Sequence, residues 1–221
     1  MKTEYFRNNQ PHFQHIGAAF SVTVMVHDAV PQAWLDNLRN EREDAILRIQ
    51  TDDLRKAQLQ KDAIYFLYDQ QLEAMLDAKR DQENPFLNEL AARCCLENAK
   101  KYDGQYYRLD AICVMSNHIH MLMDFSIQVP GDWNGRADIP NYKNLAELVG
   151  RIKGGTSSCV NKALLREGTL WMVGYHDRYI RSAEHYRDVL RYIVNNPVKA
   201  DIVANWEDYP YTYLHPALRL E

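Results

Sequence analysis

The chain has 221 residues, of which 46% are hydrophobic and 25% charged, and its net charge at pH 7 is −4. This length suits one large domain with a buried core, and no apolar run approaches the roughly 20 residues of a membrane span. The first 17 residues lack the apolar core of a signal peptide, and the four cysteines contain no CxxC pair. We therefore expect a cytoplasmic protein without a disulfide framework, a thiolate zinc site or a membrane partner.

The N-terminal half predicts one strand followed by a long helical segment. Residues 18–27 place Val, Thr and Phe in near alternation and read as a first strand, which Pro31 closes. Residues 32–102 are rich in Leu, Ala, Glu, Lys and Arg at helical spacing. We expect one or two helices there, and a further helix from Pro85 to about Lys101. The whole of 32–102 is interpreted as a helical insertion after the first strand.

The middle of the chain predicts a hairpin and a loop. Residues 105–114 are β-branched and aromatic and read as a second strand, and residues 118–125 read as a third. Ser116 and Asn117 between them suit a tight turn. The Pro- and Gly-rich stretch 126–142 is expected to be a loop.

The C-terminal part predicts a helix, a strand and a second helix. The first helix is expected from about 144 to 167, interrupted near Gly154–Gly155. Residues 170–180 read as a fourth strand, and the last helix is expected over 182–196, where Pro197 stops it.

This order of elements predicts an α+β fold in a single domain, residues 1–221. Without the insertion, the order is that of a ferredoxin-like split β-α-β sheet with one extra C-terminal helix. The fold alone decides no function, because the same topology carries many.

Two histidines stand out in the stretch "MSNHIHMLMDF" at 115–125. Side chains alternate along a strand, so His118 and His120 share one face about 7 Å apart, while Ile119 points the other way. One interpretation is a half-exposed strand whose polar face shows two imidazoles. The other is a metal site. With no cysteine nearby its remaining ligands would be oxygens, which favours Mg²⁺ or Mn²⁺.

The predicted C-terminal helix carries a phenol and an amide one turn apart, at Tyr192 and Asn196. Arg187, Arg191 and then Lys199 add positive charge. A packed core tyrosine and an asparagine at a helix end are the plain alternative. A phenol is also a suitable nucleophile toward phosphorus, but its pKa near 10 means that it needs help, which a metal would supply.

The charge is distributed unevenly along the chain. Residues 1–100 hold 12 Lys and Arg against 16 Asp and Glu, a balance of −4, whereas residues 143–199 hold 10 against 5, a balance of +5. A locally basic segment can follow a phosphate backbone, with an affinity that falls as salt rises.

These motifs together resemble those of the single-tyrosine transposases. "VMSNHIHML" is similar to their HUH signature (His, bulky apolar, His), and "YIVNNPVKADIV" to their tyrosine motif. The block "RIKGGTSSCVNKALLREGTLWMVGYHDRYIRS" between them is similar to that of the REP-associated tyrosine transposases. The resemblance is strong over 105–213 and loose across the insertion. Ser116 stands where the family usually has proline, and Asp201 where it has glycine.

The resemblance implies an HUH-endonuclease fold and a DNA transposase that cuts and rejoins hairpin-containing single-stranded DNA. By position in the motifs, His118, His120 and Asn196 would hold Mg²⁺ or Mn²⁺, and Tyr192 would form a 5′-phosphotyrosine intermediate. DNA contacts are expected from the basic residues of the matching segment: Lys153, Arg178, Arg181, Arg187, Arg191 and Lys199.

Two rival functions remain open at this point. One is a domesticated protein that binds hairpin DNA without cutting it. The other is a metal-dependent phosphodiesterase that uses activated water and forms no covalent adduct. A homodimer, in which the tyrosine serves its own or its partner's histidines, is also left open.

Overall fold

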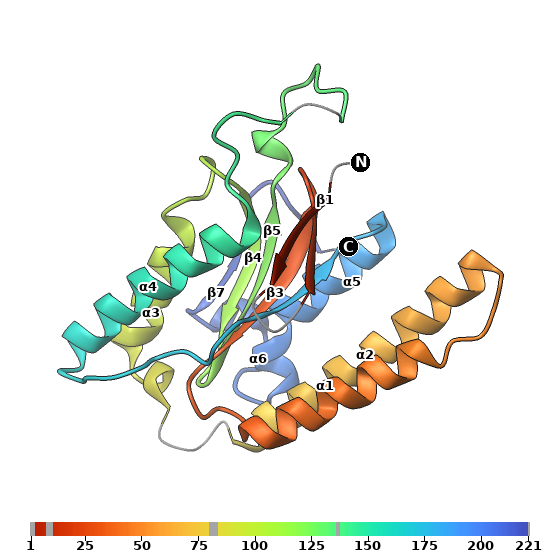
Figure 1. The fold of residues 1–221 in the computed structure, drawn as a ribbon. Coiled ribbons are helices and arrows are strands. Elements are labelled where there is room, and N and C mark those ends of the chain that lie inside the picture. Colours follow the sequence, from red (N-terminus) through yellow and green to blue (C-terminus); the bar gives the residue numbers. More distant parts are fainter. Residues whose placement is uncertain (1–2, 8–10, 80–83, 136–137, 221) are drawn as a thin grey trace.

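A five-stranded antiparallel sheet forms the centre of the protein, which we describe from a computed structural model covering residues 3–7, 11–79, 84–135 and 138–220. The strand order is β6-β3-β5-β4-β7 (Figure 1). The strands are β3 (Ala19–Met25), β4 (Arg108–Val114), β5 (His118–Asp124), β6 (His176–Tyr179) and β7 (Thr212–Leu214). A separate hairpin of β1 (Thr3–Arg7) and β2 (Pro11–His15), which the sequence did not predict, precedes the sheet.

The expected α+β class is confirmed. Strand β5 lies between β3 and β4, so the connection from β3 to β4 passes over an intervening strand. The helices are α1 (Gln32–Leu47), α2 (Leu54–Ala78), α3 (Glu89–Lys100), α4 (Leu145–Ala163), α5 (Ala183–Val194) and α6 (Asn196–Lys199). Single 3₁₀ turns occur at Pro85–Leu87, Ser126–Gln128 and Trp206–Asp208.

The helices cover both faces of the sheet (Figure 1). Helices α3 and α4 bury one face, to which Ile119 and Met121 of β5 contribute. Helix α5 buries the other face together with Leu122. Because β5 is covered on both sides, the interpretation of its histidines as residues of a half-exposed strand is wrong: His118 and His120 are 1% and 2% exposed.

The insertion is shorter than the sequence indicated. Helix α3 packs beside α4 in the layer on the sheet, so only α1 and α2 stand apart as an antiparallel hairpin (Figure 1). At the other end of the chain, α5 ends at Val194, two residues earlier than expected. Pro197 does not stop that helix but lies in the first turn of α6, a position that tolerates a missing N–H.

Helix α4 runs without interruption through Gly154–Gly155, where a break was expected. Gly155 faces α3, and a Cβ added there would lie 2.3 Å from Oδ1 of Asn98. Nothing lies within 4 Å of the same position on Gly154. The second glycine therefore allows two helices to approach closely, and the pair does not end the helix.

A disulfide joins the same two helices, contrary to the expectation from the cysteine spacing. Cys94 on α3 is bonded to Cys159 on α4, 65 residues away. Its neighbour Cys95 is a buried free thiol. Adjacent cysteines on a helix point in directions about 100° apart, so only one of the two meets Cys159.

Among the residues that the structure describes, no helix is both long enough and apolar enough to cross a bilayer.

Candidate active site

The two histidines lie side by side on the face of β5 that α5 covers. Their Nε2 atoms are 3.0 Å apart, and the ring planes meet at 78°. Strand alternation thus places both imidazoles on one face, as the sequence predicted, and the twist of the rings turns both Nε2 atoms toward one point.

The protonation of His118 is fixed by its neighbour in the turn. Asn117 donates its side-chain amide N–H to the carbonyl of Leu76 on α2 over 2.9 Å. Its Oδ1 therefore faces Nδ1 of His118, at 2.7 Å. An amide oxygen can only accept, so Nδ1 of His118 carries the proton and Nε2 presents a lone pair.

His120 is oriented by the opposite strand. Thr23 of β3 is its register partner, and the Thr23 hydroxyl lies 2.9 Å from Nδ1 of His120. This contact leaves Nε2 of His120 facing Nε2 of His118.

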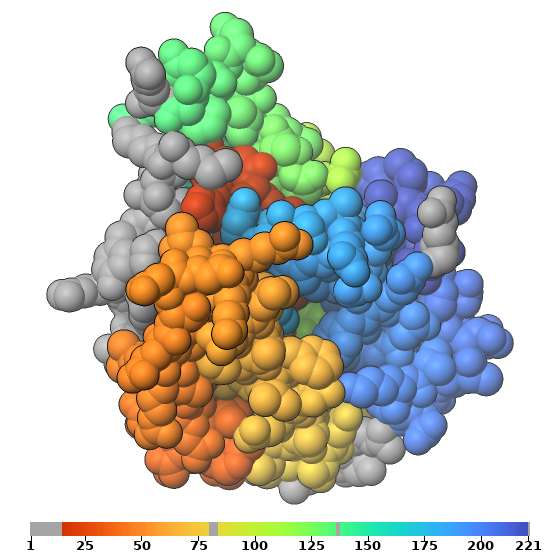
Figure 2. All heavy atoms as spheres, turned by 90° about the vertical axis from the view of Figure 1, so that its right-hand side faces the viewer, coloured from red at the N-terminus to blue at the C-terminus, as the bar shows by residue number. Residues whose placement is uncertain are grey.

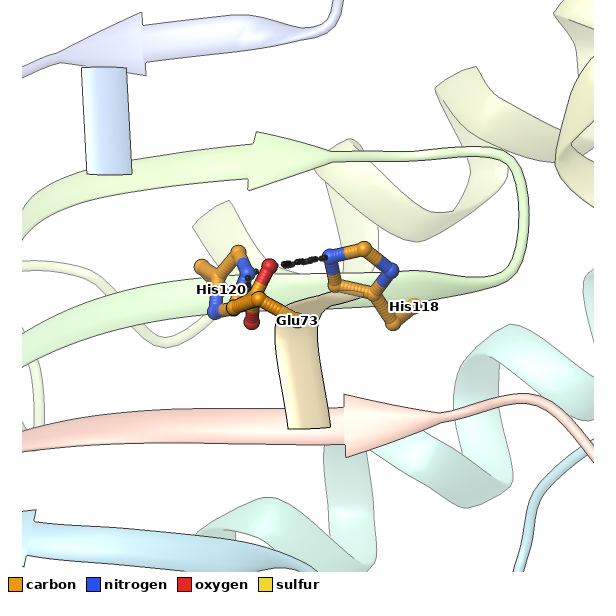
Figure 3. A group of neighbouring side chains, drawn as sticks. All are labelled: Glu73, His118 and His120. Carbon is orange, nitrogen blue, oxygen red and sulfur yellow. Dashed lines mark hydrogen bonds and ion pairs between the residues drawn. The ribbon is translucent and has the colours of Figure 1, made fainter. Parts of the chain in front are cut away.

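A third group, Glu73 of helix α2, completes the cluster and was not predicted from the sequence. The side chain reaches over β5 so that its carboxylate points at both imidazoles (Figure 3). Oε1 lies 3.1 Å from Nε2 of His120 and Oε2 lies 3.8 Å from Nε2 of His118. The three residues are buried and offer one ligand atom each, all within 4.8 Å of one another.

This donor set suits a divalent cation. The two Nε2 atoms converge at 3.0 Å and the His118 nitrogen carries no proton, so either a proton on His120 or a cation must lie between them. Two imidazole nitrogens and one carboxylate form a group that could hold a metal ion. Glu73 also supplies the negative charge that a buried cation needs.

The electrostatics of the cluster favour neutral His118 and ionised Glu73. Burial and the adjacent His120 lower the pKa of His118 to about 3. Burial by itself raises the pKa of Glu73, but the charge and hydrogen bond of His120, followed by His118 and Tyr192, outweigh it. The pKa of Glu73 therefore lies well below its usual range.

Tyr192 of α5 reaches the same cluster, as the sequence predicted. Its ring stands edge-on to His120, with centroids 5.4 Å apart. Tyr192 and Glu73 line the same cavity. Burial, and then the charge of Glu73 and hydrogen bonding to it, raise the pKa of Tyr192 far above its usual value, so the phenol is protonated at rest.

A cavity of about 440 Å³ leads from the surface to this cluster. Figure 2 shows the hollow between the orange-to-yellow α1–α2 hairpin and blue α5, with green atoms of the β4–β5 part of the chain at its floor. Its lining includes Glu73, His120, Tyr192, Arg178 and Lys199. The cavity thus joins the candidate nucleophile to two of the predicted DNA contacts.

Asn196, the predicted third ligand, begins helix α6 and is 3% exposed. In the described part of the chain, its Nδ2 atom has no hydrogen-bond partner. The polar contacts described for the two imidazoles are with each other and with Glu73, Thr23 and Asn117.

The predicted cationic contacts divide into two groups. Arg178 pairs with Asp69 of α2 at 2.9 Å, and Arg181 pairs with Asp62 of the same helix. Arg187 is exposed on α5, Arg191 lies 4.0 Å from Asp188, and the Lys199 ammonium stands 5.5 Å from the Tyr192 ring centroid. All of these lie on the Tyr192 side of the sheet.

Lys153 does not lie with them. It is on α4, which covers the opposite face, and its ammonium donates to the carbonyls of Met172 and Gly174 at 2.8 and 2.7 Å. Burial lowers its pKa to about 8. These contacts fix the segment before β6, and they argue against the predicted DNA contact.

The chain is similar to two known proteins and to one solved structure. No protein-family model matches the chain. Two Haemophilus influenzae proteins are each 28% identical to it. One, described only as uncharacterized, aligns over 122 residues, 51% of this chain and 67% of its own length. The other is described as "Putative REP-associated tyrosine transposase" and aligns over 126 residues, 56% of this chain and 69% of its own.

A solved structure shares the fold. It is described as a REP-associated tyrosine transposase bound to a REP hairpin, and it superposes with a TM-score of 0.51 at 14% sequence identity. The match covers 93% of this chain and 82% of the other.

Proposed function

We propose that the chain, as a distant relative of the REP-associated tyrosine transposases, is a DNA transposase that cleaves and rejoins hairpin-containing single-stranded DNA. In this proposal the sheet is the ferredoxin-like platform of an HUH endonuclease, with the α1–α2 hairpin inserted after its first strand. One observation carries the proposal: the ring of Tyr192 stands 5.4 Å from that of His120, whose Nε2 lies 3.1 Å from the buried carboxylate of Glu73.

His118, His120 and Glu73 would hold the divalent cation, Mg²⁺ or Mn²⁺. When bound, the cation supplies positive charge to the scissile phosphate and to its transition state. Asn196 stands where the family has an amide ligand one turn after the tyrosine, and we propose it as a further oxygen ligand.

Tyr192 is the nucleophile in this mechanism. Its phenolic oxygen forms a bond to phosphorus while the bond from phosphorus to the 3′-oxygen breaks, which leaves a 5′-phosphotyrosine and a free 3′-OH. The phenol proton passes to the carboxylate of Glu73 in the same cavity, and the departing 3′-oxygen takes up a proton. A 3′-OH can later attack the phosphotyrosine and reverse the step, so the linkage conserves the bond energy and no nucleotide cofactor is needed.

Within one chain, Tyr192 already lies beside His120. We therefore propose that the tyrosine acts on the histidines of its own subunit, so that cleavage requires no partner subunit even if a homodimer forms.

The test is a search for the covalent intermediate. The protein is incubated with an end-labelled hairpin oligonucleotide that carries single-stranded flanks, with Mn²⁺ or with a chelator, and is run on a denaturing gel. We expect an adduct with Mn²⁺ that disappears in Tyr192→Phe and persists in Tyr186→Phe, a matched control on the same helix.

Each contrary result points to a different function or excludes the role of Tyr192. An adduct that survives in Tyr192→Phe refutes the role of that residue. A shift of the native complex without any cleavage identifies the hairpin-binding alternative. Cleavage without an adduct identifies a phosphodiesterase that uses water.

A further inference from the structure

Helix α2 places a row of carboxylates against the site. Asp62, Asp69 and Glu73, which we call the acidic stripe, are spaced by seven and four residues and so lie on one face of the helix. Glu73 enters the metal cluster, and the other two contact cationic side chains of the β6 segment.

The contacts of Asp62 and Asp69 occupy both arginines of that segment. Asp69 pairs with Arg178 at 2.9 Å and with His176 at 3.0 Å, and Asp62 pairs with Arg181. Asp69, His176 and Arg178 line the same cavity as Tyr192. The guanidinium groups are therefore next to the candidate nucleophile but are engaged by carboxylates of the insertion.

The outer part of α2 meets the β6 segment through these charged contacts and through the Tyr65 ring, whose centroid lies 5.9 Å from the Arg178 guanidinium. The buried residues of the helix are all in its C-terminal part: Tyr68, Leu72, Glu73 and Leu76. Leu54, Leu59, Phe66 and Leu67 are exposed. With little apolar surface buried in the outer part, exchange of its ion pairs for other anions costs little.

We infer that the phosphates of the DNA strand leading to Tyr192 bind Arg178 and Arg181, and that they displace the carboxylates of Asp69 and Asp62 and with them the outer part of α2. The identity of the ligand as DNA rests on the proposed function. Guanidinium groups bind phosphate oxygens with the same two-donor geometry that they offer a carboxylate. Each phosphate contact also releases counterions from the DNA, whereas an internal carboxylate contact does not.

Binding is measured apart from chemistry, by fluorescence anisotropy of a fluorescein-labelled hairpin with single-stranded flanks, in chelator and with Tyr192→Phe throughout. We expect the double variant Asp62→Asn and Asp69→Asn to bind about tenfold more tightly, because the arginines are no longer engaged. The control is Glu41→Gln with Asp44→Asn, which removes two charges from exposed sites on α1 that have no ion pair among the described residues. If the control gains as much DNA affinity, the exchange of carboxylate for phosphate is overturned, because the change in net charge alone would then explain the tighter binding.

A second pair of changes tests the surface itself. Arg178→Gln with Arg181→Gln is expected to weaken binding at least about tenfold and to reduce the slope of log affinity against log salt by about 1.4, the value for two phosphate contacts on a single strand. Wild-type affinity and slope in this variant would place the DNA elsewhere.

Hydrogen exchange is measured on the Tyr192→Phe protein, whose acidic stripe is intact, so this result does not depend on whether the other variants fold. On addition of the oligonucleotide, we expect faster exchange in residues 54–69, and slower exchange there would overturn the displacement. These measurements need neither metal nor cleavage, so they can fail while the covalent adduct still forms, and the two proposals fail separately.

Discussion

Glu73 lines the same cavity as Tyr192 and its charge raises the pKa of that phenol, although the first residue belongs to the inserted hairpin and the second to the helix on the sheet. The same carboxylate lies 3.1 Å from Nε2 of His120. A single acidic side chain therefore connects the candidate nucleophile to the candidate metal ligands, and the insertion forms part of the site.

Removal of a residue of the cluster is expected to abolish tight binding of Mn²⁺. We expect His118→Ala and Glu73→Gln to lower the affinity by more than about 100-fold, and Asn117→Ala, which only orients His118, by about 10- to 100-fold. Isothermal titration calorimetry with Mn²⁺ measures this. His27→Ala, an exposed histidine paired with Asp28, is the control and should bind as the wild type does. Unchanged affinity in Glu73→Gln would remove Glu73 from the ligand set.

The metal-free protein is expected to lose stability on mild acidification. The pKa of His118 is lowered to about 3 in the folded state, against about 6.5 in the unfolded chain, so the unfolded state binds more protons between these values. The stability is complete above pH 6.5 and falls as the pH drops toward 3. Glu73, whose pKa is also lowered, acts in the same direction below about pH 4.3.

Between pH 7 and pH 5 the His118 contribution amounts to about 2 kcal/mol, or roughly 4–8 °C in Tm. Thermal melts in chelator at the two pH values measure it. His118→Asn should flatten the dependence, whereas His27→Asn should not. A wild-type Tm that is the same at pH 7 and pH 5 would contradict a neutral, buried His118.

The adjacent glycines of α4 are expected to respond in opposite directions to alanine. At Gly155 the new methyl group meets Asn98, whose amide is already bound to the Cys94 carbonyl, so we expect a loss of about 1–3 kcal/mol. At Gly154, which is exposed in mid-helix, we expect a gain of about 0.5–1 kcal/mol. Chemical denaturation of both variants gives the comparison, and a stabilised Gly155→Ala would show that α3 and α4 can separate.

Lys153→Met is expected to reduce stability without affecting DNA binding. The change removes two charged hydrogen bonds to the carbonyls of Met172 and Gly174, which together contribute about 3–6 kcal/mol. Lys162→Met, on the exposed side of α4, should leave both properties unchanged. Lys199→Met should weaken hairpin binding, because Lys199 lines the cavity. A selective loss of DNA affinity in Lys153→Met would restore its predicted role.

The parts of the site that follow from local geometry could be predicted from the sequence. The shared face of His118 and His120 follows from strand alternation. Tyr192 was singled out by the resemblance of its motif to that of the transposases, because geometry alone does not distinguish it from the other tyrosines. Glu73 could not be found in this way. It is one of many acidic residues in a helix whose docking on the sheet is decided by tertiary packing, and its spacing to the histidines carries no signal.

The differences in the fold have a similar cause. A glycine pair favours a helix break when the helix is considered alone, but Gly155 is required by the close approach of α3. Cys94 and Cys159 show no disulfide spacing, because helix rotation and packing bring them together. Composition likewise does not distinguish α3 from the helices of the insertion, because all three helices share the same residue types.

The hydrogen bond from Asn117 to the Leu76 carbonyl means that the inner end of α2 also sets the tautomer of His118. Binding of the cation and docking of the inserted hairpin on the sheet are consequently coupled, and by linkage each one changes the equilibrium of the other. A cation bound at the imidazoles stabilises the docked position of this end of the helix. Displacement of this end in turn lowers the affinity for the cation by the same factor.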